Sequence, residues 1–141
     1  MHLDLAVGTR LPAYPTSMGR VLLGALPDGE LASLISDVTP CQFTDATVTD
    51  PGALTAAIRS AGQDGYALVD QELEEGLRSL AVPVHDGRGR VAAAAVNIAL
   101  HAGRGTPDEA VATLLPPLRD AAAAIADDVA TVRRWSTNSA S

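Results

Sequence analysis

The sequence has one cysteine, no lysine and only four aromatic residues, and each shortage excludes something. A single cysteine excludes an internal disulfide and fits a reducing, cytoplasmic setting. One Trp, two Tyr and one Phe are too few for a surface that stacks nucleic-acid bases. No apolar run reaches the roughly 18–20 residues that cross a bilayer, and the first residues lack the features of a signal peptide. We therefore expect a cytoplasmic protein without membrane contact.

The charge of the chain is strongly acidic. Ten arginines face 17 acidic residues, which gives a net charge of −7. Such a chain repels phosphate backbones, so any contact with DNA would need a segment that is not present here. With 141 residues, 47% of them hydrophobic, the chain can bury a core without disulfides or metals. We expect a single domain over residues 1–135, followed by a flexible tail over 136–141.

Hydrophobic spacing and capping signals predict the element order β, α, α, α, β, β, β, α, α. The alternation of Leu3, Leu5 and Val7 predicts a first strand. Pro116 and Pro117 are expected to break or kink the helical region that follows Pro107. The order favours an α+β fold in which helices flank an antiparallel sheet. The expected strands cover residues 2–8, 66–70, 76–86 and 90–102, and the expected helices cover 17–26, 28–36, 51–64, a short one from 107, and a final one to about 135.

Residue types that carry catalysis or bind metals do not form a recognisable motif. Carboxylates crowd residues 70–75 and could act as acid and base, but their pattern is typical of a solvated turn, a strand edge or a cap. Ser17, Ser79 and Cys41 lack the surroundings of a nucleophile, and the three histidines lack metal-ligand spacing. We expect no enzyme activity, no metal and no cofactor.

Two small polar residues fall in apolar surroundings on neighbouring predicted strands. Ser79 shares a face with Leu77, and Asn97 shares a face with Ala99. A buried hydroxyl or amide needs a hydrogen-bond partner. The two side chains are therefore either a satisfied cross-strand pair or donors that line a pocket for a small polar ligand, and the pattern leaves both open.

Three stretches of the chain together indicate a known family. The stretches "VGTRLPAYPTSMGRVLLGAL", "DGYALVDQELEEGLRSLAVPVHDGRGRVAAAAVNIALHAGR" and "LLPPLRDAAAAIADDV" occur in this order. From about residue 5 to 133 the chain resembles the C-terminal effector-binding domain of the IclR family of bacterial transcriptional regulators. The segments "GTRLPAYPTSMGRVLL", "LVDQELEEGLRS" and "NIALHAGR" resemble the branch that controls catabolism of aromatic acids through β-ketoadipate.

The resemblance implies a GAF-like (profilin-like) α+β domain with a roughly six-stranded antiparallel sheet. It also implies a homodimer or tetramer whose DNA-binding domain, an upstream winged helix-turn-helix, is absent from this chain. Members that bind small 2-oxo acids carry Gly-Ala at the helix start, Asp at 69, Cys at 79 and Ser at 97 and 99. Met18 and Val69 make this pocket more apolar and favour a larger or aromatic effector. Carried over by position, the pocket residues are Ser17, Met18, Val69, Leu77, Ser79, Asn97 and Ala99.

The expected function is a ligand sensor. The resemblance implies that a small aromatic or dicarboxylic acid binds this domain and thereby controls DNA binding by the absent domain. Arg10 and Arg78 are either partners of the effector's carboxylate or members of surface or structural ion pairs. The alternative is an oligomerisation module of the same regulator without a functional pocket.

Overall fold

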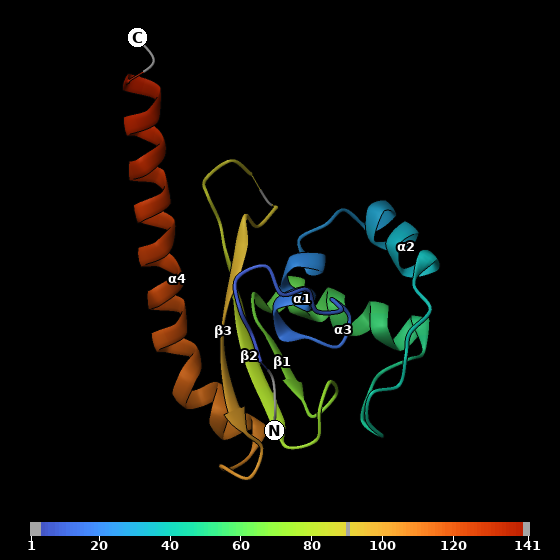
Figure 1. Ribbon diagram of the computed structural model, residues 1–141. Coiled ribbons are helices and arrows are strands. Elements are labelled where there is room, and N and C mark those ends of the chain that lie inside the picture. Colours follow the sequence, from blue (N-terminus) through green and yellow to red (C-terminus); the bar gives the residue numbers. More distant parts are fainter. Residues whose placement is uncertain (1–3, 90, 140–141) are drawn as a thin grey trace.

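Helices cover both faces of a three-stranded antiparallel sheet (Figure 1). The computed structural model describes residues 4–89 and 91–139. Helices α1 and α3 lie on one face of the sheet, with α2 outside them, and α4 lies on the other face. The expected α+β class, with helices flanking an antiparallel sheet, is confirmed. In chain order the elements are α1 (Ser17–Gly24), α2 (Asp28–Asp37), α3 (Pro51–Asp64), β1 (Ala67–Asp70), β2 (Leu77–Val84), β3 (Ala94–His101) and α4 (Pro107–Asn138).

Alternation along β2 gives the sheet two different faces. Leu80, Val82 and Val84 point toward α4 and pack with Leu115 and Leu118 in the main apolar core. The other face carries smaller side chains. There Ala67 and Ala81 are buried together with side chains of α1 and α3. Because successive residues of a strand point to opposite faces, Ser79 lies on the α1 side and Arg78 lies on the α4 side.

Local signals explain where most helices begin and end. Thr16 accepts a hydrogen bond from the Gly19 N–H and so caps α1. Asp50 caps α3 in the same way, and Gly65, with φ of 72°, ends it in the left-handed conformation. At the start of α4, Thr106 and Glu109 form a reciprocal capping box. These signals are local in the sequence, which is why the prediction located these helices.

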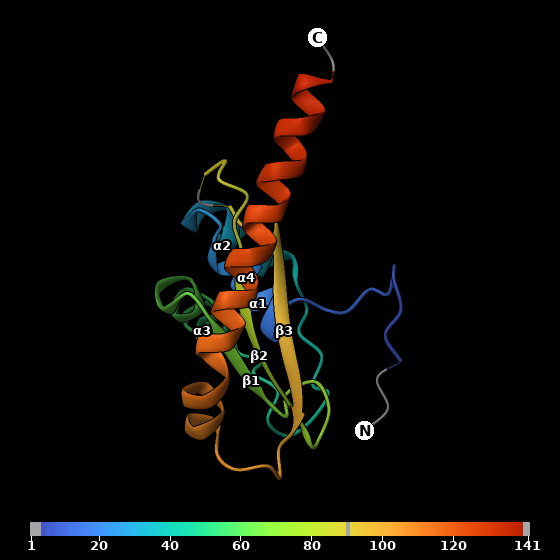
Figure 2. The same ribbon diagram turned by 90° about the vertical axis from the view of Figure 1, so that its left-hand side faces the viewer.

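The expected strand over residues 2–8 is wrong for residues 4–8, and residues 2 and 3 lie outside the described residues. The Thr9 N–H donates to the carbonyl of Ala6 in a turn, and the segment stands away from the sheet (Figure 2). Leu5 is 57% exposed and Val7 is fully exposed. An alternating pattern makes a strand only where a neighbouring strand supplies hydrogen bonds, and here none is adjacent.

The sheet has three strands in the described part of the chain, where the resemblance implied about six. β2 lies in the middle and pairs with both neighbours. β3 is therefore an edge strand, and its residues are half-buried or exposed. Residues 91–93, which were expected to belong to this strand, lie in the hairpin loop instead, and residue 90 lies outside the described residues.

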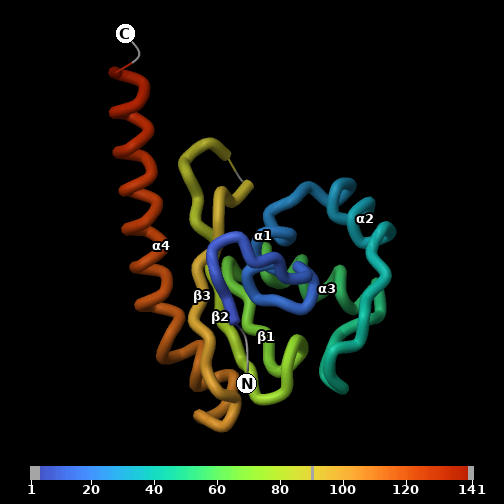
Figure 3. The backbone as a smooth tube through the Cα atoms, in the orientation of Figure 1, coloured from blue at the N-terminus to red at the C-terminus, as the bar shows by residue number. Residues whose placement is uncertain are grey.

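Helix α4 is one helix where two were expected. It continues through Pro116 and Pro117, and its first turns are inclined to the rest (Figure 1). The prolines remove backbone hydrogen bonds, but packing of Leu115 and Leu118 on the sheet holds the turns together. The helix also reaches Asn138, so residues 136–138 of the expected tail are helical. Its C-terminal turns extend past the sheet, where Trp135 is 74% exposed (Figure 3). Within the described residues, no helix is long and apolar enough to span a bilayer.

Two glycines set the distance between α1 and α3. A Cβ placed on Gly62 would lie 2.2 Å from the carbonyl oxygen of Gly24, well inside contact distance. We expect Gly62→Ala to lower the free energy of unfolding by about 1–3 kcal/mol, because the helices must separate. Gly29→Ala is the matched control, since nothing lies near its Cβ and alanine favours helix. Urea unfolding of both variants checks this, and equal stability of the two would contradict the close-contact explanation.

An ion pair connects the β2–β3 hairpin to the C-terminal half of α4. Arg133 of α4 donates to the Asp86 carboxylate, and the Arg88 N–H donates to the same side chain at 2.9 Å. The hydrogen bond from Arg133, and next the one from the Arg88 backbone, lower the pKa of Asp86 below its ordinary value of 3.8. The folded state thus favours the ionised carboxylate more than the unfolded state does.

This pKa shift predicts a pH dependence of stability. Because the folded-state pKa is lowered, the contribution of Asp86 is complete above the unfolded pKa and is lost as pH falls below about 4 toward the folded pKa. We expect Asp86→Asn and Arg133→Gln to remove this part of the acid sensitivity. Urea unfolding at several pH values in the acid range measures the free energy of unfolding of each variant. If this free energy falls with pH as steeply in the variants as in the wild type, the pair does not contribute to the acid sensitivity.

Candidate functional site

A small cavity opens on the α1 side of the sheet. Its volume is about 230 Å³, which is below the roughly 300–1,000 Å³ of pockets for drug-sized ligands. It therefore suits a ligand of about one ring. The loop before α1, the first turn of α1, the turn after β1 and strands β2 and β3 all contribute to it. The lining residues are Leu5, Leu11, Thr16, Ser17, Met18, Leu73, Leu77, Ser79, Asn97 and Ala99.

Several hydrogen-bonding groups line the cavity. The hydroxyls of Ser17 and Ser79 lie 2.7 Å apart and connect α1 to β2. The backbone N–H groups of Ser17 and Met18 begin α1 and have no acceptor among the described residues. The Asn97 side chain likewise has no partner among them, although it faces the same cavity. These groups can donate to an oxygen anion, and the N-terminus of a helix favours negative charge.

The remaining wall is apolar, and the described residues that line the cavity include no charged side chain. Leu11, Met18, Leu73 and Leu77 form most of it, and Leu5 lies at the exposed mouth. A ligand would therefore bury an apolar body against leucine and methionine and place its polar end against α1. Hydrogen bonds and the helix terminus, rather than a cation, would hold the charge.

The structure brings together six of the nine residues that the sequence indicated. Ser17, Met18, Leu77, Ser79, Asn97 and Ala99 all line this cavity. Ser79 is bonded to Ser17 and not to Asn97, so the cross-strand pair considered from the sequence does not form.

The other three candidates lie elsewhere. Val69 pairs with Ser79 on the adjacent strand but is 3% exposed and does not line the cavity. Arg10 is exposed and outside it. Arg78 is buried on the α4 side, where it binds Asp70 at 2.9 Å and the Gly105 carbonyl at 2.9 Å. Of the two alternatives for Arg78, the geometry fits the structural ion pair.

The carboxylates of residues 70–75, which were expected to form a solvated turn, a strand edge or a cap, differ from one another in burial. Glu72 is 7% exposed and forms a two-pronged ion pair with Arg20 of α1, at 2.7 and 2.6 Å. Asp70 binds Arg78 on the other face of the sheet. Glu75 is the exposed member of the group. Sequence reasoning missed Arg20 and Glu72, and the only available signal was that Arg20 falls one turn after Ser17 on the same helix.

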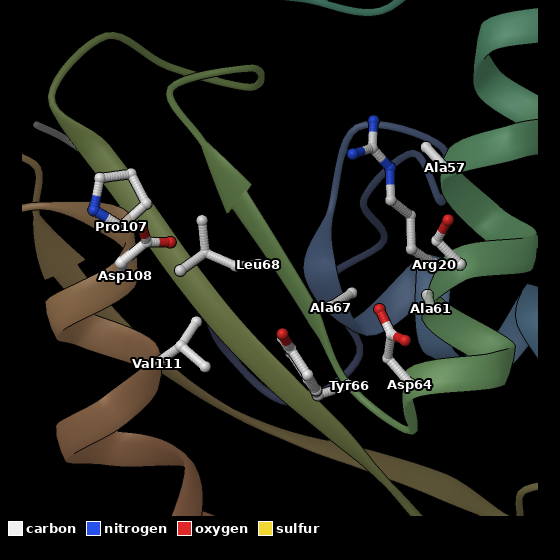
Figure 4. A pocket seen from close by; sticks show the side chains of 11 residues that line it. Arg20, Ala57, Ala61, Asp64, Tyr66, Ala67, Leu68, Pro107, Asp108 and Val111 are labelled. Atoms are coloured by element: carbon white, nitrogen blue, oxygen red, sulfur yellow. The ribbon is translucent and has the colours of Figure 1, made fainter.

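A second cavity, of about 330 Å³, lies beyond the outer edge of β1 between α3 and the start of α4 (Figure 4). Asp64 and Asp108 line it, together with Tyr66 and small residues of α3. Its one cation, Arg20, is already engaged by Glu72. Two carboxylates without a free cation repel an organic acid, so the cavity beside α1 is the better site for such a ligand.

The described residues offer no group of three or more His, Cys, Asp or Glu side chains that could hold a metal. Among the described residues, the hydroxyls of Ser17 and Ser79 bond to each other and to no histidine or carboxylate, which are the side chains that activate a serine nucleophile. What the arrangement can do is bind a small molecule.

Comparison with known proteins identifies the family of the chain. The family model "Bacterial transcriptional regulator IclR C-terminal" matches residues 1–127. The Pca regulon regulatory protein of Pseudomonas putida is 46% identical over 118 residues, which are 84% of this chain and 40% of that protein. The p-hydroxybenzoate hydroxylase transcriptional activator of Acinetobacter baylyi is 34% identical over 122 residues, or 86% of this chain and 43% of that protein. The chain thus spans less than half the length of these relatives, which are named as transcriptional regulators.

Solved structures show the same fold. The inducer-binding domain of a PobR double mutant from Acinetobacter, in complex with 3-hydroxybenzoic acid, has a TM-score of 0.78 and 32% identity, covering 84% of this chain and 67% of that one. A Rhodococcus sp. RHA1 protein assigned as a transcriptional regulator has a TM-score of 0.87 and 45% identity, covering 94% of this chain and 52% of that one. The chain belongs to the IclR family of bacterial transcriptional regulators and corresponds to the family's C-terminal, effector-binding domain.

Proposed function

We propose that the cavity beside α1 binds a small aromatic acid with a single carboxylate, and that this binding regulates transcription. The observation that carries the proposal is that hydrogen-bond donors and an apolar wall line the same small cavity. The N–H groups of Ser17 and Met18, the Ser17–Ser79 hydroxyl pair and Asn97 meet at one small cavity. The ring would lie against Leu73, Leu77 and Met18.

Simple energetics support an affinity of useful size. Hydrogen bonds to a charged group contribute about 1.5–3 kcal/mol each. Two or three of them at the start of α1, together with burial of one ring, approach the roughly 8 kcal/mol that corresponds to micromolar binding.

The lining favours one carboxylate over two. A dicarboxylic acid would place its second charge against leucine and methionine, because the lining residues that the structure describes include no cation. Burying an unpaired carboxylate is costly. The Acinetobacter domain with 3-hydroxybenzoic acid, a ring with one carboxylate, is a relative that agrees with this choice.

In the full regulator we propose that an upstream winged helix-turn-helix contacts DNA in the cytoplasm, as a homodimer or tetramer. The net negative charge of this domain agrees with a regulator in which a different domain contacts DNA. The effector can shift DNA binding only if it binds one arrangement of the subunits more tightly than the other.

One observation favours the alternative, an oligomerisation module without a functional pocket. Val132 and Trp135 are 65% and 74% exposed on the part of α4 that extends past the sheet. Exposed apolar side chains of this size often mark contacts with another protein. The open cavity weighs against the alternative, because a vestigial site is expected to be filled.

Calorimetric titration with protocatechuate, 4-hydroxybenzoate and β-ketoadipate tests the proposal. We expect heat from at least one aromatic acid and none from β-ketoadipate, because the cavity provides for one carboxylate only. Binding of β-ketoadipate alone would overturn the ligand class but not the sensor role. No heat from any of the three would favour the oligomerisation module.

Substitutions in the polar end separate site binding from other binding. Ser79→Ala and Asn97→Ala are each expected to weaken binding of the aromatic acid by about tenfold or more, because one hydrogen bond to a charged group contributes about 1.5–3 kcal/mol. Arg10→Gln serves as the control, because Arg10 is exposed and outside the cavity. The same calorimetric titration measures all three. A large loss of affinity in Arg10→Gln, with no loss in the other two variants, would show that Arg10 binds the ligand's carboxylate.

A further inference from the structure

A single guanidinium connects three of the segments that line the cavity. Arg20 lies in α1, one turn after Ser17. Its Nε donates to the Tyr14 carbonyl at 2.9 Å and so holds the loop that carries Leu11 and Thr16. Its two terminal nitrogens bind the Glu72 carboxylate, directly beside Leu73. Strands β2 and β3 also line the cavity, but the side-chain hydrogen bonds of Arg20 go to Tyr14 and Glu72 and to neither strand.

Glu72 is held as firmly as its partner. The Val48 N–H donates to its carboxylate at 3.1 Å, and the Thr47 hydroxyl donates to its backbone carbonyl at 2.6 Å. Gln71, the residue before it, has a positive φ of 59°, which is rare outside glycine. The Thr44 hydroxyl fixes that residue through its carbonyl at 2.6 Å. The turn that presents Leu73 is therefore held by Glu72 and its neighbours in addition to the hairpin bond from the Gln71 N–H to the Leu77 carbonyl, at 2.8 Å.

We propose that Arg20 and Glu72 are positioning residues of the effector site. They set the spacing between the first turn of α1, which carries the donors, and Leu73, which closes the apolar wall. The proposal rests on the proposed function for its effect on ligand affinity, but its effect on the cavity walls can be measured without a ligand. If either wall moves by a fraction of an ångström, a single ring fits less well. The ligand then cannot keep both its short hydrogen bonds to α1 and its close packing against Leu73.

The chain contains a matched control two residues away. Asp70 also pairs with a buried arginine, Arg78, at 2.9 Å. That pair lies on the α4 face of the sheet, neither residue is among those that line the cavity, and the further bond of Arg78 goes to the Gly105 carbonyl. Glu72→Gln and Asp70→Asn therefore make the same chemical change, carboxylate to amide, against a buried guanidinium on opposite faces.

Two measurements on the full 141-residue chain test the proposal. Amide hydrogen exchange, followed by mass spectrometry, reports on residues 11–18 and 71–77 without a ligand. We expect Glu72→Gln to speed exchange in both segments and Asp70→Asn to leave residues 11–18 unchanged. Calorimetry with 4-hydroxybenzoate and protocatechuate is expected to show affinity at least about tenfold lower in Glu72→Gln and within about twofold of wild type in Asp70→Asn.

Arg20→Lys keeps the positive charge and covers the case in which Glu72→Gln does not fold. It retains one contact to Glu72 but loses the bond to Tyr14, so exchange in residues 11–18 is expected to rise and affinity to fall by an intermediate factor. Unchanged exchange at both walls, or equal loss of affinity in Asp70→Asn and Glu72→Gln, would overturn the positioning role.

The design separates this proposal from the proposed function. If the wild-type chain binds none of the acids, the proposed function fails, and the exchange measurement still decides whether the ion pair positions the cavity walls. If the wild type binds an acid and Glu72→Gln binds it equally well, the proposed function stands and the positioning role fails.

Discussion

The buried ion pair between Arg20 and Glu72 constrains the geometry of the whole α1 side of the molecule. Removing two charges from water costs several kcal/mol for each ion, so such a pair adds little net stability. Leaving either charge without its partner, however, costs about 3–5 kcal/mol. The structure meets this constraint by giving both groups further hydrogen bonds, from the Val48 N–H and to the Tyr14 carbonyl. Segments far apart in the sequence are thereby kept in one arrangement.

Strand β2 separates the binding side of the molecule from its stabilising core. Neighbouring residues of this strand serve different purposes: Arg78 faces a structural ion pair beneath α4, whereas Ser79 faces the cavity beneath α1. Large side chains fill one face, and small ones leave room on the other. The alternation of a single strand therefore produces both a packed core and a cavity whose polar end meets the start of a helix.

The sequence was sufficient where the signals are local. Helix caps at Thr16, Asp50 and Thr106 and the alternation around Ser79 and Asn97 located the helices and the polar residues of the cavity. It was insufficient where a partner is distant or absent. The alternation before Val7 needs a neighbouring strand that the described residues do not supply.

Two further features depended on packing. The continuation of α4 through Pro116 required the sheet beneath it. The contact between Arg20 and Glu72 joins residues 52 positions apart, and neither residue carries a local sign of the other. The resemblance to a family supplied residues such as Met18, whose place at the cavity no local pattern indicated.

The position of Trp135 determines what fluorescence can report in this protein. It is the single tryptophan of the chain and lies largely in water on the C-terminal part of α4, on the opposite side of the sheet from the cavity. A ligand that enters the cavity beside α1 therefore does not contact Trp135 and does not change its emission directly. A second subunit or another protein that covers α4 would instead remove the indole from water and shift the emission to shorter wavelength. The protein thus carries an intrinsic optical probe of contacts at α4, and its signal does not depend on direct contact with a ligand in the cavity.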